Sequence, residues 1–439
     1  MLQRVSSMSV SIVERWLPDP FVLVLLLTLV VFVAGIVVEG QSPVTMIKYW
    51  GNGFWELLQF AMQMVLILVT GWVLATTIFL RRILEAIAKL ARTPGQAIVL
   101  VTLVSLAASW INWGFGLVIG AMFARQLARE VSGVDYRLLI ASAYSGFLVW
   151  HGGLSGSVPL TIATPEHFLA AEMGVVSTSS TTFAAFNLWI VLALFISVPI
   201  LNRWMMPKPG HTVMVDPALL KETPFAQGVS VDTPAARLDN SLLLAQTVGI
   251  MGVIFAAWYF LATNGSIDIN IVNFLFLFLG ILLHGRPSRF LAAAGDAARG
   301  ASGIIVQFPF YAGIMGMIAG SGLVATLSKL FVAVSSEYTL PLFTFLSAGL
   351  VNLFIPSGGG QWVVQGPIMI AAATDLGADL ARVSMAVAWG DAWTNMIQPF
   401  WALPALAIAG LRAKDIMGYC LIVLVVSGVI IGLGLTFLP

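Results

Sequence analysis

Three consecutive glycines beside a serine and two glutamines are the feature of this sequence best suited to binding a ligand. They lie in PSGGGQWVVQGP, residues 356–367, within an otherwise apolar stretch. Glycine lets the backbone approach a ligand closely, and Ser357 can cap a helix that starts after it. A helix N-terminus carries free N–H groups and the positive end of the helix dipole, so we expect a site for a small anion here. The residues expected to form it are Ser357, Gly358, Gly359, Gly360, Gln361 and Gln365, with the two glutamines on one helix face.

A matching glycine-rich segment, INWGFG, occupies residues 111–116. It also interrupts an apolar stretch, and we expect it to form the opposite side of the same site. In both segments the alternative is that the glycines only allow two helices to pack closely. The candidate binding residues of this second segment are Ser109, Asn112, Gly114 and Gly116.

Two further interruptions carry residues that could bind a coupling ion. HGGLSGS spans residues 151–157, and GDAWTNMIQPFW spans residues 390–401. Unwound backbone carbonyls, together with Asn, Thr and Ser oxygens, suit a small cation such as Na+. The residues expected to serve ion coupling are His151, Ser155, Ser157, Asp391 and Thr394. Those expected to add to substrate binding are Asn395, Gln398 and Trp401.

Asp391 and His151 each have two interpretations. A carboxylate inside a membrane is costly and marks a functional site, where it could bind a cation or a proton. The alternative is an Asp near a helix end, exposed at the outer interface or capped by a neighbour. His151 could relay a proton, because histidine titrates near neutral pH in water. It could equally be a buried, hydrogen-bonded structural histidine.

Five tryptophans lie in or beside these four segments: Trp113, Trp150, Trp362, Trp393 and Trp401. Their rings could line an apolar slot for a short acyl tail. The alternative is that they belong to the core or to the aromatic belt at the membrane interface.

The remaining composition gives no support for a metal centre or for coupling to ATP. The chain has four His and one Cys, without metal-ligand spacing, and it has no Walker A pattern. We therefore expect no catalytic residues and no cofactor, with Na+ or H+ as the coupling ion.

The elements that position these segments must be membrane-spanning helices. Of the 439 residues, 59% are hydrophobic and 9% are charged, whereas soluble domains carry roughly 25% charged residues. Most of the surface must therefore face lipid. The net charge of +1 argues against a nucleic-acid partner.

A spanning helix needs about 20 apolar residues, and this length predicts nine spans. Seven are continuous: 20–38, 54–78, 183–204, 241–262, 268–285, 301–320 and 416–437. Two more, 138–163 and 380–409, are broken at the segments described above. Each of the stretches 97–124 and 341–373 has two apolar arms of roughly 12 to 15 residues, which are short for spans and predict re-entrant hairpins.

The positive charges predict the orientation. Lys and Arg cluster in alternate loops, which places the N-terminus in the cytoplasm and, with nine spans, the C-terminus in the periplasm. The two halves then have the same order of elements in opposite orientations. Such an inverted repeat is typical of transporters whose site lies at the midplane. The predicted organisation is a first repeat over 1–205, a cytoplasmic linker over 206–240, a connecting span over 241–262 and a second repeat over 263–439, with a short interfacial helix at 286–299.

Seven segments carry a family resemblance that runs nearly end to end. They are RWLPDP (15–20), GFWELLQFAMQM (53–64), INWGFGLVIGAMFAR (111–125), VQFPFYAGI (306–314), PSGGGQWVVQGP (356–367), QPFWALPALAIAGL (398–411) and DIMGYC (415–420). In them the chain resembles the bacterial short-chain fatty acid transporter family, whose members include acetoacetate and butyrate uptake proteins. That family is similar to others of the ion transporter superfamily. The resemblance implies an elevator motion, in which the hairpins and broken spans slide against the other helices, and it implies a homodimer.

These observations together predict an all-α polytopic protein of the bacterial inner membrane, built as an elevator-type secondary transporter with inverted repeats. We expect it to carry small monocarboxylates such as acetoacetate or butyrate, coupled to Na+ or H+. The carboxylate would sit between the hairpin tips, held by backbone N–H groups and by Ser357, Asn112, Gln361 and Asn395, with the acyl tail against the tryptophans.

Two alternatives stay open. The first is a carrier of the same architecture for another anion, such as a dicarboxylate; it is disfavoured because neither tip holds a Lys or Arg for a second negative charge. The second is a membrane-embedded enzyme, for which Asp391 and His151 would be the only conceivable acid–base pair.

Overall fold

The computed structural model describes residues 18, 20–208, 210–216, 233–262, 265–398 and 400–439. Across these ranges every regular element is a helix and no strand occurs. Six of the described helices are long and apolar enough to cross a membrane, and four shorter apolar helices accompany them. An all-helical membrane protein is therefore confirmed, while the two broken spans appear as shorter helices separated by unwound chain. The predicted segment RWLPDP lies almost wholly outside the described residues.

The first helices form part of a wall around the centre. They are α2 (Pro20–Val37), α3 (Pro43–Gly53), α4 (Leu58–Ala75) and α5 (Ile78–Ala88). Ser42 caps α3 and Thr77 caps α5 through their side-chain oxygens, the usual way to satisfy free N–H groups at a helix start. Both α2 and α3 pack on α16 (Ser302–Ser321). The sequence patterns predicted a span at 54–78, and α3 and α5 were not expected as separate helices.

The first predicted hairpin is an antiparallel pair of helices, α6 (Pro94–Ile111) and α7 (Trp113–Glu130). Asn112 alone separates them, and its side chain caps α7. Both arms have 18 residues, so the predicted arm length was too short. Gly114 and Gly116 lie in the first turn of α7, not in a loop. A Cβ on Gly116 would overlap the backbone of Ser109 on α6, so the close-packing role applies to this glycine.

The first broken span is confirmed as three pieces. These are α8 (Tyr136–Ser145), the 3-10 helix η1 (Gly146–Gly152) and α9 (Ser157–Ala163). Residues 153–156 form the unwound part. Since α8, η1, α6 and α7 all pack on one another, the break lies directly beside the α6–α7 turn.

The middle of the chain contains the predicted connecting span. The elements are α10 (Ala170–Met173), η2 (Thr178–Ser180), α11 (Ala185–Trp204), α12 (Pro234–Asp239) and α13 (Leu242–Ala262). The predicted linker 206–240 falls mostly on coil and on residues outside the described ranges, namely 209 and 217–232.

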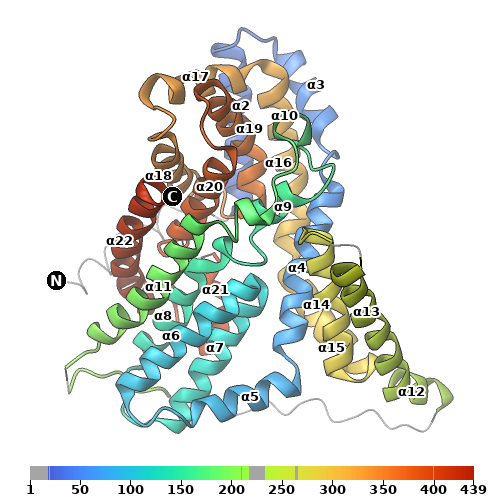
Figure 1. Ribbon diagram of the computed structural model, residues 1–439, viewed down its shortest axis with the longest axis vertical. Coiled ribbons are helices and arrows are strands. Elements are labelled where there is room, and N and C mark those ends of the chain that lie inside the picture. Colours follow the sequence, from blue (N-terminus) through green and yellow to red (C-terminus); the bar gives the residue numbers. More distant parts are fainter. Residues whose placement is uncertain (1–17, 19, 209, 217–232, 263–264, 399) are drawn as a thin grey trace.

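On one side of the molecule, α14 (Ile269–His284) and α15 (Pro287–Gly300) pack on α4, and α13 packs on α14 (Figure 1). The predicted short helix at 286–299 is confirmed as α15. After α16, Gly322 turns the chain with φ +98°, a left-handed conformation that glycine adopts without strain. The next helix, α17 (Leu323–Val334), packs on α19 and was not predicted.

The second half ends in α18 (Leu340–Asn352), α19 (Gly358–Leu376), α20 (Leu380–Thr394), α21 (Ala402–Ala409) and α22 (Ala413–Phe437). The α18 and α19 helices pack on each other and on α20, and η1 also packs on α20. The break in the second broken span begins at Asn395, later than the predicted Gly390. Asp391 therefore lies in the last turn of α20 and is fully buried, which excludes an exposed position at the outer interface.

Candidate functional site

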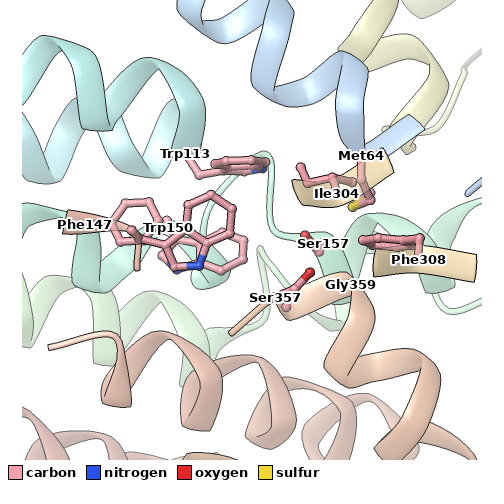
Figure 2. Close-up of a pocket in the computed structure, with 11 residues that line it drawn as sticks. Met64, Trp113, Phe147, Trp150, Ser157, Ile304, Phe308, Ser357 and Gly359 are labelled. Atoms are coloured by element: carbon pink, nitrogen blue, oxygen red, sulfur yellow. The ribbon is translucent and has the colours of Figure 1, made fainter. Parts of the chain in front are cut away.

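A narrow pocket lies where the broken elements of the two halves meet. Its cavity volume is about 10 Å3, room for roughly one water molecule, and it is lined by Met64, Trp113, Phe147, Trp150, Ser157, Ile304, Phe308, Ser357, Gly358, Gly359 and Trp401. Figure 2 shows the two serine side chains between the rings of Trp113, Phe147 and Trp150 on one side and Met64, Ile304 and Phe308 on the other. A mostly apolar lining with a few polar groups is usual for a small-molecule site, and a substrate could enter here only if the lining moves apart.

The polar side of the pocket is the start of α19. Ser357 caps this helix by accepting a hydrogen bond from the Gly360 N–H at 3.3 Å, which confirms the predicted cap. Within the described chain, the N–H groups of Gly358 and Gly359 have no acceptor. Free N–H groups and the positive end of the dipole of the 19-residue α19 attract a carboxylate.

The start of α7 reaches the same pocket through Trp113. Asn112 caps α7 by accepting from the Phe115 N–H at 2.9 Å. The Trp113 N–H donates to the Ser155 hydroxyl at 2.9 Å, and the Leu154 N–H donates to the Trp110 carbonyl at 2.7 Å. These bonds tie the α6–α7 turn to the unwound part of the first broken span. The Asn112 amide nitrogen is buried with no partner among the described residues.

Aromatic rings form one wall of the pocket. The Trp113 ring lies 5.1 Å from the Trp401 ring and 6.0 Å from the Trp150 ring, measured between centroids. Phe147 stacks on Trp150 at 5.5 Å. Three of the five expected tryptophans thus line the pocket. Trp362 and Trp393 do not: Trp362 is buried in the core, and Trp393 donates to the Leu424 carbonyl on α22.

A histidine–aspartate pair lies directly behind this wall. The His151 Nδ1 atom is 3.1 Å from Asp391 Oδ2, and both side chains are fully buried. The Val158 N–H, near the start of α9, donates to His151 Nε2 at 3.1 Å. Because Nε2 accepts a hydrogen bond, the ring proton must be on Nδ1, where it is donated to Asp391. The imidazole is therefore neutral, and Asp391 Oδ2 accepts the Nδ1–H.

The second break is connected to the first by Asn395. Its side-chain oxygen accepts from Trp150 Nε1 at 3.1 Å, and its backbone carbonyl accepts from the Tyr144 hydroxyl at 2.7 Å. Since Trp150 Nε1 can only donate, the Asn395 amide oxygen must face it. The amide nitrogen of Asn395 is left buried without a partner in the described chain.

Two of the expected binding residues are bonded away from the pocket. Gln361 Nε2 donates to the Ala348 carbonyl at 2.9 Å and to Gln365 Oε1 at 2.9 Å. This bond confirms that the two glutamines share a helix face. Gln365 Nε2 donates to the Ser347 hydroxyl on α18. In this arrangement Gln361 has no N–H left for a carboxylate, because both of its hydrogens are used.

The other expected residues fall into two groups. Ser357, Gly358, Gly359, Trp401 and Ser157 line the pocket. Ser109, Asn112, Ser155, His151, Asp391, Thr394, Asn395 and Gln398 are buried around it without being part of its wall. Two glycines serve helix contacts: a Cβ on Gly114 would lie 2.9 Å from the Leu68 carbonyl oxygen, and one on Gly360 would lie 2.6 Å from the Tyr311 ring.

The sequence patterns missed four apolar residues of the pocket: Met64, Phe147, Ile304 and Phe308. They come from α4, η1 and α16. None of them belongs to an expected site segment, and only Phe147 lies close to one in the sequence. Apolar residues are frequent throughout a membrane protein, so no local signal separates pocket residues from lipid-facing or core residues.

A second, wider cavity of about 600 Å3, partly open to the outside, lies between α4, α5, α7, α14 and α15. Four arginines and two acids line it: Arg81, Arg125, Arg129, Arg289, Glu85 and Asp296. It contains none of the expected site residues. The excess of positive charge on its wall attracts anions toward this end of the molecule.

Known sequences match this chain over nearly its whole length. The model of a family described as short chain fatty acid transporter matches residues 1–438. A protein of Escherichia coli (strain K12), provisionally named a short-chain fatty acid transporter, is 49% identical over 438 residues, which are 99% of this chain and 100% of that protein. A protein of Haemophilus influenzae with the same provisional name is 46% identical over 447 residues, covering 100% of each.

One solved structure extends the comparison to the fold. The YdaH transporter of Alcanivorax borkumensis superimposes with a TM-score of 0.58, covering 95% of this chain and 98% of that one. The two sequences are 16% identical, so the likeness concerns the fold alone.

Proposed function

Since this chain belongs to the short-chain fatty acid transporter family, we propose that it is a secondary transporter of small monocarboxylates such as acetoacetate and butyrate. It is a multi-pass membrane protein and a transporter, not an enzyme. The bacterial inner membrane is the proposed location, with the N-terminus in the cytoplasm and the C-terminus in the periplasm.

The observation that carries this proposal is the meeting of a free helix N-terminus with an aromatic pocket. A carboxylate in the pocket would accept hydrogen bonds from the N–H groups of Gly358 and Gly359 and from the hydroxyls of Ser357 and Ser157. The acyl tail would lie against the rings of Trp113, Phe147 and Trp150. Burial of the short tail would add about 0.8 kcal/mol per CH2 group, so affinity should depend on chain length.

Nearby orphan donors support an anionic substrate. The amide nitrogens of Asn112 and Asn395 and the indole nitrogens of Trp113 and Trp401 are buried without acceptors among the described residues. A buried N–H without an acceptor costs free energy that a bound carboxylate could recover. We propose that small shifts of the two breaks bring Asn112 and Asn395 onto the substrate.

The charge of the pocket favours one carboxylate over two. Among the described residues, its wall contains no Lys or Arg. A dicarboxylate would bury a second negative charge without a basic partner, which is strongly unfavourable. The helix N-terminus of α19 can compensate about half a charge, enough for a single carboxylate with additional hydrogen bonds.

We propose that transport is coupled to Na+ or H+ through Asp391 and His151. These side chains join η1, in the first broken span, to α20, in the second. An ion bound here would therefore bias the relative position of both breaks. Ser155 would contribute to ion coupling through its bond to the Trp113 N–H. Thr394 would contribute because it lies one helical turn after Asp391.

We further propose an elevator motion of two inverted repeats, 1–205 and 263–439, joined by the linker 206–240 and the span 241–262, in a homodimer. Breaks at Asn112 and at residues 353–357 support two hairpins of similar design, each followed by a side-chain-capped helix. In this proposal both hairpins re-enter the membrane, the first from the cytoplasmic side and the second from the periplasmic side.

Uptake of radiolabelled butyrate and acetoacetate into proteoliposomes tests the proposed function. The purified protein would be given a Na+ gradient, a pH gradient or no gradient. We expect uptake driven by one of the two gradients and competition by other short monocarboxylates but not by succinate. Failure to exchange any monocarboxylate, with folded protein verified in the same vesicles, would contradict the substrate assignment.

A further inference from the structure

Three buried oxygen atoms beside the pocket have no hydrogen-bond donor among the described residues: Asn352 Oδ1, Gln361 Oε1 and Asp391 Oδ1. All three side chains are fully buried. They come from α18, α19 and α20, which pack together. A buried acceptor without a partner calls for an explanation, and a bound ion is one that would account for all three.

The orientation of both amides is set by their neighbours. Asn352 Nδ2 donates to the Asp391 carbonyl at 3.0 Å and to the Thr394 hydroxyl at 2.9 Å. Gln361 Nε2 donates to the Ala348 carbonyl. A carbonyl only accepts, so in each amide the nitrogen must occupy the bonded position. The oxygen is then the atom left over, and rotating either amide would break the bonds that exist.

Charge balance points the same way. The Asp391 carboxylate accepts from a His151 ring that is neutral, because Val158 N–H occupies its other nitrogen. In the described chain, Asp391 forms no ion pair with a Lys or Arg. A fully buried carboxylate without a compensating charge is very costly. The buried carboxyl must therefore be neutralised, either by a proton or by a bound cation.

We propose that Asn352, Gln361 and Asp391 bind a single dehydrated monovalent metal cation, Na+, through these three oxygens. Amide and carboxylate oxygens are the ligands that hard cations prefer. An anionic substrate is excluded from this position, since every free atom is an acceptor. The donors left over near the pocket, the amide nitrogens of Asn112 and Asn395, suit the carboxylate instead.

The cation site and the substrate pocket share the first two turns of α19. Gly358 lines the pocket, and a Cβ built on it would lie 3.2 Å from Asp391 Oδ2, while Gln361 follows three residues later. Binding of Na+ would therefore hold the start of α19 in the position that presents its N–H groups to the substrate. This coupling rests on the proposed transport function, whereas the cation site itself does not.

Direct binding of 22Na+ to the purified protein, without substrate, tests the site. We expect saturable binding that unlabelled Na+ displaces and K+ displaces at least about tenfold less well. Asp391→Asn and Gln361→Met should each weaken binding by roughly tenfold or more, because each removes one ligand. Ser384→Ala is the matched control: this buried serine also lies on α20 and donates to the Leu380 carbonyl, so its loss should leave 22Na+ binding unchanged.

The outcomes separate the cation site from the transport function. Absence of saturable 22Na+ binding by folded wild-type protein would overturn the proposal, and so would wild-type affinity in both variants. If 22Na+ binds as expected but no monocarboxylate exchanges in liposomes, the cation site stands and the proposed function fails. If butyrate exchange is robust while 22Na+ does not bind, the function stands and the site fails, leaving a proton as the coupling ion.

Discussion

The side chains of His151 and Asp391, 240 positions apart in the chain, meet with 3.1 Å between Nδ1 and Oδ2, and neither is exposed. His151 lies in the last turn of the 3-10 helix of the first broken span, and Asp391 lies in the last turn before the second break. The pair therefore joins the two interrupted elements beside the pocket. Neither break can move alone without separating a buried hydrogen-bonded pair.

Removing the ring of His151 should destabilise the protein strongly. His151→Phe would leave the Asp391 carboxylate and the Val158 N–H buried without this partner, a cost of about 3–5 kcal/mol. His151→Asn can still donate to Asp391 and should lose less. The thermal unfolding midpoint of both variants in detergent checks this order. Equal midpoints for His151→Phe and the wild type would contradict the importance of the pair.

Loss of the Ser357 hydroxyl should weaken substrate binding more than it weakens the fold. Ser357→Ala removes both the cap of α19 and a donor to the carboxylate, so we expect the KM for butyrate to rise about tenfold. Ser42→Ala, which removes the comparable cap of α3 far from the pocket, is the control. It should lower stability by about 1 kcal/mol with no change in KM. A similar KM in both variants would argue against substrate binding at Ser357.

A methyl group on Gly116 should disrupt the α6–α7 hairpin. Its Cβ would overlap the Ser109 backbone, and overpacking of this kind costs about 1–3 kcal/mol or more. In Gly51→Ala, also within a helix, nothing lies within 4 Å of the new Cβ. That variant should be neutral or gain about 0.5–1 kcal/mol from helix propensity. The free energy of unfolding of the two variants, measured in parallel, should fall for Gly116→Ala and stay the same or rise for Gly51→Ala. A Gly116→Ala variant as stable as the wild type would show that the hairpin can open at this contact.

Enlarging the pocket should shift the preferred chain length. Ile304→Ala removes part of the apolar wall, so longer monocarboxylates such as hexanoate should compete better for butyrate exchange, by up to about tenfold. Ile98→Ala removes a similar side chain from the core on α6, outside the pocket. It should lower stability without changing the order of competitors. An unchanged order in Ile304→Ala would place the acyl tail elsewhere.

Local patterns predicted those features that depend on residues close together in the chain. The Ser357 cap, the shared face of Gln361 and Gln365 and the break after His151 all follow from contacts over a few residues. The predicted lengths were less accurate. Asn112 interrupts two full 18-residue helices instead of two short arms, because its cap lets α7 start at once. Likewise, α20 continues past Gly390 to Thr394, because α20 packs along α18, where Asn352 bonds to its last turn.

By itself, the sequence determined the class of the protein, an all-helical membrane transporter, and its family, because composition and motif order do not depend on how the helices pack. It also determined which segments break. Only the tertiary structure decided which atoms meet there. The bonds of His151 to Asp391 and of Trp150 to Asn395 join residues 240 and 245 positions apart, and Met64, Ile304 and Phe308 reach the pocket from distant helices. The donors and acceptors that stay unpaired around the site are those that remain after these long-range bonds have formed. No local sequence pattern could therefore have predicted which polar groups stay unpaired.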